Sequence, residues 1–235
     1  MRRGAAAPRG VFVTGTDTGV GKTVVACALI RGLRARGIEV GALKPVETGV
    51  GSEGPADARA LLAACGSPDL SLDDVCPQRF ALAAAPTVAA RAEGRRVELD
   101  AMEAAFGRVM ARHDCIIVEG AGGLLAPAAE DLSMAELALR LALPLLLVAR
   151  ARLGTLNHTR LTLEAARARG LPVLGLVVCH ADGELTPAEA ANLEALREDP
   201  GVAWLGEIPP LPPGTLPASD ALDLEVVLTA VRSLS

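Results

Sequence analysis

Short, continuously apolar runs alternate along the chain with stretches in which apolar residues recur every three or four positions. Polar residues do not occupy every second position of the apolar runs. That pattern is typical of strands with both faces buried, as in a parallel sheet covered by helices. It predicts six strands, at residues 11–13, 38–43, 114–119, 144–150, 171–179 and 202–208.

The stretches between these runs have the spacing of helices, as Val25, Leu29 and Leu33 illustrate. Helices are predicted at residues 24–37, 57–65, 99–112, 134–143, 155–169, 186–197 and 220–233. We expect a glycine-rich loop at 46–55 and a turn-rich segment at 209–214. Prolines at 68, 77 and 86 predict irregular structure over 66–95.

The first apolar run leads directly into a glycine-containing loop, VFVTGTDTGVGKT, and then into a predicted helix. This layout is typical of a phosphate-binding loop, in which backbone N–H groups and the helix N-terminus bind phosphate. Lys22 would reach the outer phosphates and Thr23 would ligate Mg²⁺. The strict motif has glycine where this chain has Thr16, so a plain glycine-rich turn before a helix stays an alternative.

Strand–helix alternation together with this loop predicts an α/β protein of a single domain, residues 1–235. The expected architecture is a three-layer α/β/α sandwich, P-loop NTPase-like, with a mostly parallel sheet. Ligands of such sheets bind at the carboxyl ends of the strands. Residues 15–23, Lys44, Glu119 and the pair Cys179-His180 all fall at such ends.

Only two of the 23 basic residues are lysines, Lys22 and Lys44, since 21 are arginines. Lysine offers a compact ammonium where arginine offers a planar fork, so both lysines are candidate phosphate ligands. An ordinary exposed side chain is the alternative for Lys44. Glu119 follows an apolar strand and could hold Mg²⁺ with Thr23, or lie in solvent as a strand-end acid. Asp57 could add a third metal ligand, or it could be a helix cap or an acid in the first turn of a helix.

Composition narrows the function classes. A net charge of −5 and an aromatic content of 2% argue against nucleic-acid binding. The five cysteines have no C-x-x-C spacing, which predicts reduced cytosolic thiols and no zinc site. The N-terminal residues lack a signal-peptide core, and the apolar run 141–149 is too short to cross a membrane. We therefore expect a cytoplasmic protein with neither nucleic acid nor membrane as partner.

The histidines show neither metal-ligand spacing nor a nucleophile arrangement. We expect His113 at the surface. His158 and His180 lie near predicted strand ends. Either residue could contact a ligand or have no role in binding.

The segments TGTDTGVGKT, KPVETG, ADARAL, VEGAGG, RLGTLNH and GEIP, in this order and spacing, resemble the dethiobiotin synthetase family. The resemblance covers nearly the whole chain and is weakest over residues 66–95. It implies an ATP- and Mg²⁺-dependent ligase that uses CO₂ or bicarbonate to convert 7,8-diaminononanoate to dethiobiotin, in biotin biosynthesis. A carbamate and a carbamic–phosphoric anhydride are the implied intermediates.

The resemblance also implies roles for particular residues. Catalysis would fall to Lys22, Lys44 and Thr18, and the metal would lie among Thr23, Asp57 and Glu119. The residues implied to bind the nucleotide and its metal are Gly19, Val20, Gly21, Lys22, Thr23, Val24, Asp57, Glu119, Gly120, Ala121, Gly122, Cys179, His180, Ile208, Pro209 and Pro210. The residues implied to bind the diamine substrate are Thr18, Thr48, Gly122, Leu153, Gly154 and Asn157. Residues 153–157 would act on the partner's site in a homodimer, so that each site has walls from two chains.

Two positions depart from the family pattern. Some members have glutamate where this chain has Gly19. Adenine is commonly read by an asparagine where this chain has Cys179-His180, and a thiol lacks the paired donor and acceptor of an amide. ATP stays the expected nucleotide, with looser base selectivity.

Three other functions share some of these features. A chromosome- or septum-positioning ATPase would have a second loop lysine where this chain has Asp17. An amidating relative acting on a cobyrinate-type carboxylate would need a glutaminase domain, for which 235 residues leave no room. A non-catalytic nucleotide-binding module is the third alternative.

Overall fold

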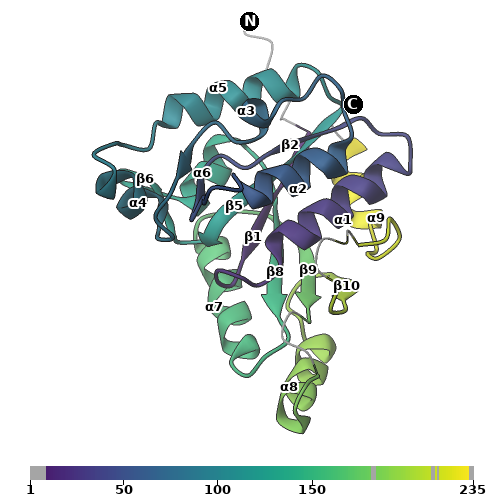
Figure 1. Cartoon of the computed structure of the whole chain (residues 1–235). Coiled ribbons are helices and arrows are strands. Elements are labelled where there is room, and N and C mark those ends of the chain that lie inside the picture. The colour runs from purple at the N-terminus through teal and green to yellow at the C-terminus, as the bar shows by residue number, and fades with distance from the viewer. Residues whose placement is uncertain (1–8, 181–183, 213–214, 216, 233–235) are drawn as a thin grey trace, which may run out of the picture.

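A six-stranded parallel sheet forms the centre of the molecule (Figure 1). The structure is a computed structural model, which describes residues 9–180, 184–212, 215 and 217–232. The strand order is β10-β9-β8-β1-β5-β2, and every neighbouring pair is parallel. The strands are β1 (Gly10–Gly15), β2 (Val40–Leu43), β5 (Cys115–Gly123), β8 (Leu145–Arg150), β9 (Val173–Cys179) and β10 (Trp204–Ile208). All six lie where the apolar runs predicted them.

Helices cover both faces of this sheet. Right-handed crossovers place the helix after β1 on one face and the helices before β5, β8, β9 and β10 on the other. The first face carries α1 (Lys22–Arg34), α2 (Ala56–Cys65) and α9 (Glu225–Arg232). The second face carries α5 (Leu99–Met110), α6 (Met134–Arg140), α7 (Thr155–Ala168) and α8 (Pro187–Glu198). Surface ion pairs link each of these four helices to the next. The predicted three-layer fold is confirmed.

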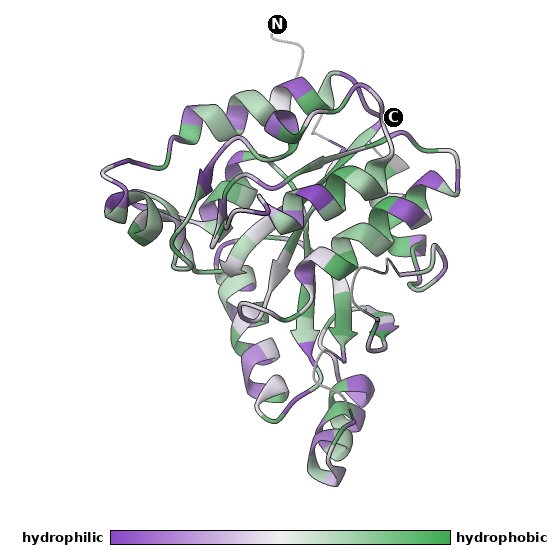
Figure 2. Cartoon of the chain, in the orientation of Figure 1, coloured by the Kyte–Doolittle hydropathy of each residue, from purple (hydrophilic) through white to green (hydrophobic). Residues whose placement is uncertain are grey.

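The core lies on both sides of the sheet, where buried side chains of the strands pack against those of the covering helices (Figure 2). Val11, Phe12 and Val13 of β1 are fully buried, as are Ile116 and Ile117 of β5. Helices α1, α2 and α5 turn apolar side chains toward these strands and polar ones outward. Because aromatic residues are few, closely packed aliphatic side chains fill the core.

The segment predicted as irregular contains regular elements, so that prediction is wrong. It holds α3 (Leu72–Val75), β4 (Arg79–Phe80) and α4 (Pro86–Ala92). Ser71 and Asp74 form a reciprocal capping box at the start of α3. β4 pairs with β3 (Glu47–Thr48), inside the predicted loop 46–55. A strand of two residues is too short to have a hydrophobic period, so pattern analysis could not detect it.

Several boundaries also differ from the prediction. β5 continues through the glycines at 120–123 because Gly123 still pairs with Gly15 of β1. A short hairpin, β6 (Pro127–Ala129) and β7 (Leu132–Ser133), precedes α6. The last helix begins at Glu225 rather than at residue 220, and its predicted end at 233 lies outside the described residues. Residues 213 and 214 of the predicted turn also lie outside them.

His113 is buried and not at the surface, which corrects that expectation. Its Nδ1 lies 2.8 Å from the carbonyl oxygen of Val109, at the end of α5. The imidazole packs against β2, so it serves the core. No helix among the described residues is long and apolar enough to cross a membrane.

Close packing of α5 on β2 gives a direct test of the fold. A Cβ added to Gly41 of β2 would lie 2.3 Å from Cγ1 of Val109 and 2.9 Å from Nδ1 of His113. We expect Gly41→Ala to lower the free energy of unfolding by about 1–3 kcal/mol, the usual cost of overpacking. Gly107→Ala on α5 is the matched control, because its added Cβ meets nothing within 4 Å. Alanine at an exposed helical site should stabilise by about 0.4–1 kcal/mol. Equal urea midpoints for both variants would contradict this packing.

Candidate functional site

The turn between β1 and α1 presents a helix N-terminus to the carboxyl edge of the sheet. Gly21 is the N-cap residue of α1, with φ 98°, and no side chain caps the helix. A Cβ at Gly21 would lie 2.7 Å from Sγ of Cys179, so glycine is required both for its conformation and for the close approach. Free N–H groups and the helix dipole favour an anion at this turn. The geometry is that of a phosphate site, as the sequence predicted.

The neighbouring loop residues support this turn in different ways. Val20 is buried and anchors the loop to the core, while Val24 is half-buried on α1. Gly19 has φ 71° and open space around it. Backbone groups, not side chains, are therefore what this part of the loop offers to a ligand.

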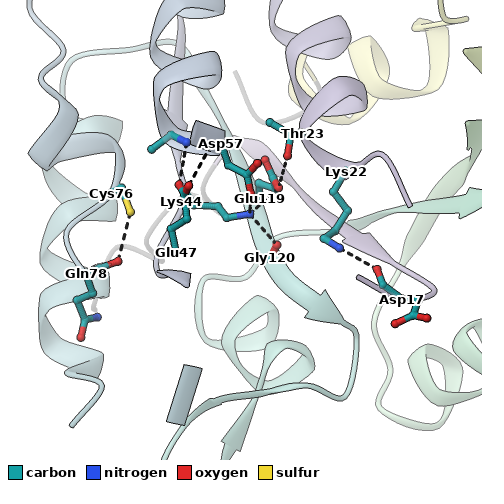
Figure 3. Close-up of polar contacts among 11 residues, drawn as sticks. Asp17, Lys22, Thr23, Lys44, Glu47, Asp57, Cys76, Gln78, Glu119 and Gly120 are labelled. Carbon is teal, nitrogen blue, oxygen red and sulfur yellow. Dashed lines mark hydrogen bonds and ion pairs between the residues drawn. The ribbon is translucent and has the colours of Figure 1, made fainter. Parts of the chain in front are cut away.

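Lys22 points back over the loop. Its Nζ donates a 2.8 Å hydrogen bond to the main-chain oxygen of Asp17 (Figure 3). Burial, reinforced by the charge of Lys44, lowers the pKa of Lys22 to about 8. A phosphate beside this ammonium would relieve that penalty, because an opposite charge favours the charged form.

Lys44, directly after β2, lies between two carboxylates (Figure 3). Its Nζ is 2.8 Å from Oδ2 of Asp57 and 2.6 Å from Oε1 of Glu119. The Thr23 hydroxyl donates to the same Oε1 of Glu119 at 2.9 Å. The structure thus brings Thr23, Lys44, Asp57 and Glu119 into one cluster, and the open alternatives of an exposed Lys44 and an exposed Glu119 are wrong.

This cluster is deeply buried. The side chains of Lys44 and Glu119 are 4% and 1% exposed. Burial alone would lower the pKa of Lys44, but the two carboxylates outweigh it and hold that pKa above its usual value. Burial raises the pKa of Glu119, opposed by Lys44. The second oxygen of Glu119, Oε2, is buried and has no hydrogen-bond partner.

Sequence analysis missed Glu47, a buried residue of β3. Its Oε1 accepts from the backbone N–H of Asp57 at 3.0 Å and its Oε2 from that of Ala58 at 2.9 Å. The N-cap residue of α2, Pro55, supplies no side-chain cap. Glu47 therefore caps α2 from a distance and fixes Asp57 in the first turn. An acid in the segment KPVETG was the only signal, and it does not specify a partner.

The donors Thr23, Asp57 and Glu119 fit a magnesium ion. All three offer oxygen, the ligand that Mg²⁺ prefers, and the unpartnered Oε2 of Glu119 is a buried acceptor with spare capacity. Among the described residues, no group of three or more His, Cys, Asp or Glu side chains could hold a metal by itself. The metal would need further oxygens, which the phosphates of a nucleotide supply.

A cavity of about 450 Å³ lies beside the phosphate loop. Thr18 and Thr48 line it together with Gly122, so three of the residues that the resemblance implied for substrate binding lie together. Gly122 has φ 71°, and its Cα faces Thr18, whose Oγ1 would lie 3.7 Å from an added Cβ. The remaining lining residues are Asp17, Ala83, Ala84, Ala85, Pro86, Ala121, Gly123 and Ala126. Gly120 lies between this wall and Lys44, its carbonyl 3.5 Å from Nζ.

The residues expected to bind the adenine base of the nucleotide lie side by side at the ends of β9 and β10. Cys179 is paired with Ile208, and the N–H of His180 donates to the Ile208 carbonyl at 2.9 Å. The Cys179 thiol is buried beside the carbonyl of Gly21. Nε2 of His180 lies 2.7 Å from Oε2 of Glu207, and Arg197 donates to the other carboxylate oxygen, Oε1. Pro209 and Pro210 follow β10 and are exposed.

Leu153, Gly154 and Asn157 do not line this cavity. They lie at the start of α7, where Leu153 is 73% exposed and Asn157 is also exposed. His158, next along α7, is exposed as well. Within one chain, the predicted substrate residues therefore fall into two separate groups.

All five cysteines are free and buried. Burial raises the pKa of Cys76 to about 11 and that of the other four to about 12. These thiols are protonated at neutral pH, so they are poor nucleophiles.

Known proteins with similar sequences also have a nucleotide-dependent function. A family model described as an AAA domain matches residues 9–218. The chain is 48% identical over 203 residues to the ATP-dependent dethiobiotin synthetase BioD of Anaeromyxobacter sp. (strain Fw109-5), covering 85% of this chain and 91% of that protein. It is 39% identical over 203 residues to the protein of the same name from Bacillus subtilis (strain 168), covering 86% of this chain and 88% of that protein.

Among solved structures, the signal recognition particle receptor FtsY of Elizabethkingia anophelis matches with a TM-score of 0.52 and 19% identity. The match covers 97% of this chain and 67% of that one and supports the fold alone. The identities to the two synthetases, each over more than four fifths of both chains, show the family. This chain belongs to the dethiobiotin synthetase family.

Proposed function

We propose that this protein is an ATP-dependent cyclo-ligase that converts 7,8-diaminononanoate, CO₂ and ATP to dethiobiotin, ADP and phosphate. One observation carries the proposal beyond family membership. The only two lysines of the chain are buried at the carboxyl edge of the sheet, one on the phosphate loop and one next to the cavity lined by Thr18 and Thr48. A site that joins a phosphoryl donor to a carboxylated amine needs positive charge at both places.

The reaction begins with the diamine. One amine attacks CO₂ and loses a proton to become a carbamate, an anion that the hydroxyls of Thr18 and Thr48 can bind in the cavity. The backbone at Gly122 lets the substrate approach closely, since no side chain intervenes. The cavity thereby orients the carbamate toward the phosphate loop, which is the main contribution of a protein to such a reaction.

Phosphoryl transfer then activates the carbamate. A carbamate oxygen attacks the γ-phosphorus, and the bond to the β-phosphate oxygen breaks to release ADP. Lys22, with the N–H groups at the start of α1, binds the β- and γ-phosphates and holds them in place. Lys44 stabilises the negative charge on the carbamate and the transferring phosphoryl group.

Mg²⁺, held by Thr23, Asp57 and Glu119, would neutralise phosphate charge when it is bound. Ring closure completes the reaction. The second amine attacks the carbonyl carbon of the carbamic–phosphoric anhydride, phosphate leaves with the bonding electron pair, and the amine loses a proton.

The substrate site is composite, with residues 153–157 of a second chain closing the cavity of the first. Leu153, Gly154 and Asn157 are remote from the cavity lining of their own chain. Leu82 and Leu125 are exposed, and each adjoins a residue that lines the cavity, Ala83 or Ala126. An apolar rim around a substrate cavity favours coverage by a second subunit. The loop before α7 ends in the helix N-terminus, which suits the substrate carboxylate.

The direct test of function is dethiobiotin formation from diaminononanoate, bicarbonate, ATP and Mg²⁺. We expect phosphate release that depends on the diamine, and Lys22→Ala should lower kcat/KM by about 10²–10³-fold because it removes a charge from the transferring phosphates. Thermal unfolding without nucleotide should change little, since burial already disfavours the ammonium that is removed. Phosphate release that does not respond to the diamine would contradict the function and favour a nucleotide-binding module.

The composite site predicts complementation between inactive chains. Mixing Lys22→Ala with Asn157→Ala should restore activity, because one of the two sites in a mixed dimer then has both residues intact. Lys22→Ala mixed with Lys44→Ala is the matched control and should stay inactive, since both lysines belong to the same chain's wall. If subunit exchange is demonstrated with tagged chains and both mixtures stay inactive, the shared site is wrong.

Base selectivity should be weak. The Cys179 thiol is buried against the phosphate loop and cannot offer the paired donor and acceptor that rejects a wrong base. We expect GTP, CTP and UTP to support dethiobiotin formation within roughly tenfold of ATP, since phosphate contacts are the same for all four. Cys179→Asn should widen the preference for ATP. A thousandfold preference in the unmodified protein at subsaturating nucleotide would show that other groups, such as His180, read the base.

A further inference from the structure

Lys44 occupies the place between Asp57 and Glu119 that a divalent cation would take. Its Nζ contacts one oxygen of each carboxylate, at 2.8 Å and 2.6 Å. The Thr23 hydroxyl donates to the same oxygen of Glu119 that Lys44 contacts. All three residues assigned to the metal are therefore already engaged (Figure 3). The Lys44 ammonium contacts Asp57 and Glu119, and Thr23 donates to Glu119.

One carboxylate oxygen of this cluster is free to bind a metal. Oε2 of Glu119 is buried without a partner, although the side chain is only 1% exposed. A buried carboxylate normally has its oxygens hydrogen-bonded, because a buried acceptor without a partner has lost its contact with water. One ammonium, donating to Asp57, to Glu119 and toward Gly120, leaves this oxygen unsatisfied.

Two cations bound to the same pair of carboxylates destabilise each other. An ammonium and a divalent ion a few ångströms apart repel strongly in a site of low dielectric constant. Lys22 adds a further positive charge close enough to act on Lys44. This repulsion favours movement of the Lys44 ammonium when a metal ion enters, and a buried ammonium can move only toward other anions.

We propose that Lys44 is the resident cation of the Asp57–Glu119 site in the nucleotide-free protein and excludes free divalent ions from it. When a nucleotide arrives, its phosphates and the carbamate supply new anions for Lys44, and the metal takes over the two carboxylates. Metal and nucleotide thus bind together, and the charge of the buried site stays balanced throughout. This inference rests on the proposed function for the identity of the metal ligands.

The consequence is specific to Lys44. Removal of its charge leaves two carboxylates and a hydroxyl without a counter-ion, which is a ready site for a divalent cation. Lys22 makes no contact with either carboxylate, since its Nζ donates to the Asp17 carbonyl. Lys22→Met is therefore a matched control that removes an equal charge from the same loop edge.

The experiment measures Mn²⁺ binding to nucleotide-free protein by electron paramagnetic resonance. Unmodified protein should bind Mn²⁺ at this site only weakly, with Kd above about 1 mM, whereas Lys44→Met should bind one ion at least tenfold more tightly. Adding Asp57→Asn to Lys44→Met should abolish that gain, and Lys22→Met should gain much less than Lys44→Met. Mn²⁺ should raise the thermal midpoint of Lys44→Met but not that of the unmodified protein.

Two results would overturn the exchange. One is tight stoichiometric Mn²⁺ binding to the unmodified protein without nucleotide, a measurement that needs no variant to fold. The other is a folded Lys44→Met chain that binds no more tightly than the unmodified protein or the Lys22→Met control.

A separate titration tests the metal ligands themselves. With ATP present, Asp57→Asn should raise the Mg²⁺ concentration for half-maximal rate about tenfold or more, because an amide is a poorer ligand for a hard cation. Asp73→Asn, an exposed acid of α3, is the matched control. An unchanged Mg²⁺ requirement would remove the metal assignment of the proposed function, and the exchange with it. A raised requirement without the Mn²⁺ gain in Lys44→Met would refute the exchange alone.

Discussion

The buried ion pair between Lys44 and Glu119 is the constraint on which the site depends. Each charge is almost completely removed from water, and loss of one partner from such a pair typically costs about 3–5 kcal/mol. The sheet makes the pair possible. Leu43 of β2 is in register with Val118 of β5, so Lys44, which follows Leu43, lies beside Glu119, which follows Val118. Parallel pairing of two strands that are distant in sequence thereby brings opposite charges together.

The surrounding elements hold that cluster in place. Glu47 caps α2 and sets the position of Asp57, while Thr23 at the start of α1 reaches Glu119. Phosphate would bind between these groups and Lys22, where the helix N-terminus already favours negative charge. The cavity lined by Thr18 and Thr48 opens next to this point. In the proposed reaction, anionic carbamate and anionic phosphate would therefore meet beside Lys22 and Lys44.

Sequence patterns predicted the sheet well because most of its strands have both faces buried and all six are several residues long. They also located the phosphate loop, Lys44 and Glu119, since parallel strands end at a common edge. The strands β3 and β4 are too short to have a hydrophobic period, so the sequence could not reveal them. Glu47 caps a helix that begins nine residues later, and no sequence signal connects the two. His113 follows a helix in a polar stretch, and only the three-dimensional packing shows that α5 buries it. The contact of Lys44 with both carboxylates likewise required coordinates, because sequence assigned the lysine to the phosphate and the acids to the metal.

The central claim is that one buried site alternates between an ammonium and a divalent metal. A crystal structure with Mn²⁺ and a non-hydrolysable ATP analogue, with the metal located by its anomalous scattering, tests this most directly. The account predicts an anomalous peak about 2.0–2.3 Å from carboxylate oxygens of Asp57 and Glu119, a distance set by hard-cation coordination. Nζ of Lys44 should lie on the phosphates and no longer on either carboxylate. A metal bound elsewhere, or a Lys44 that keeps both carboxylate contacts beside the bound metal, would contradict it.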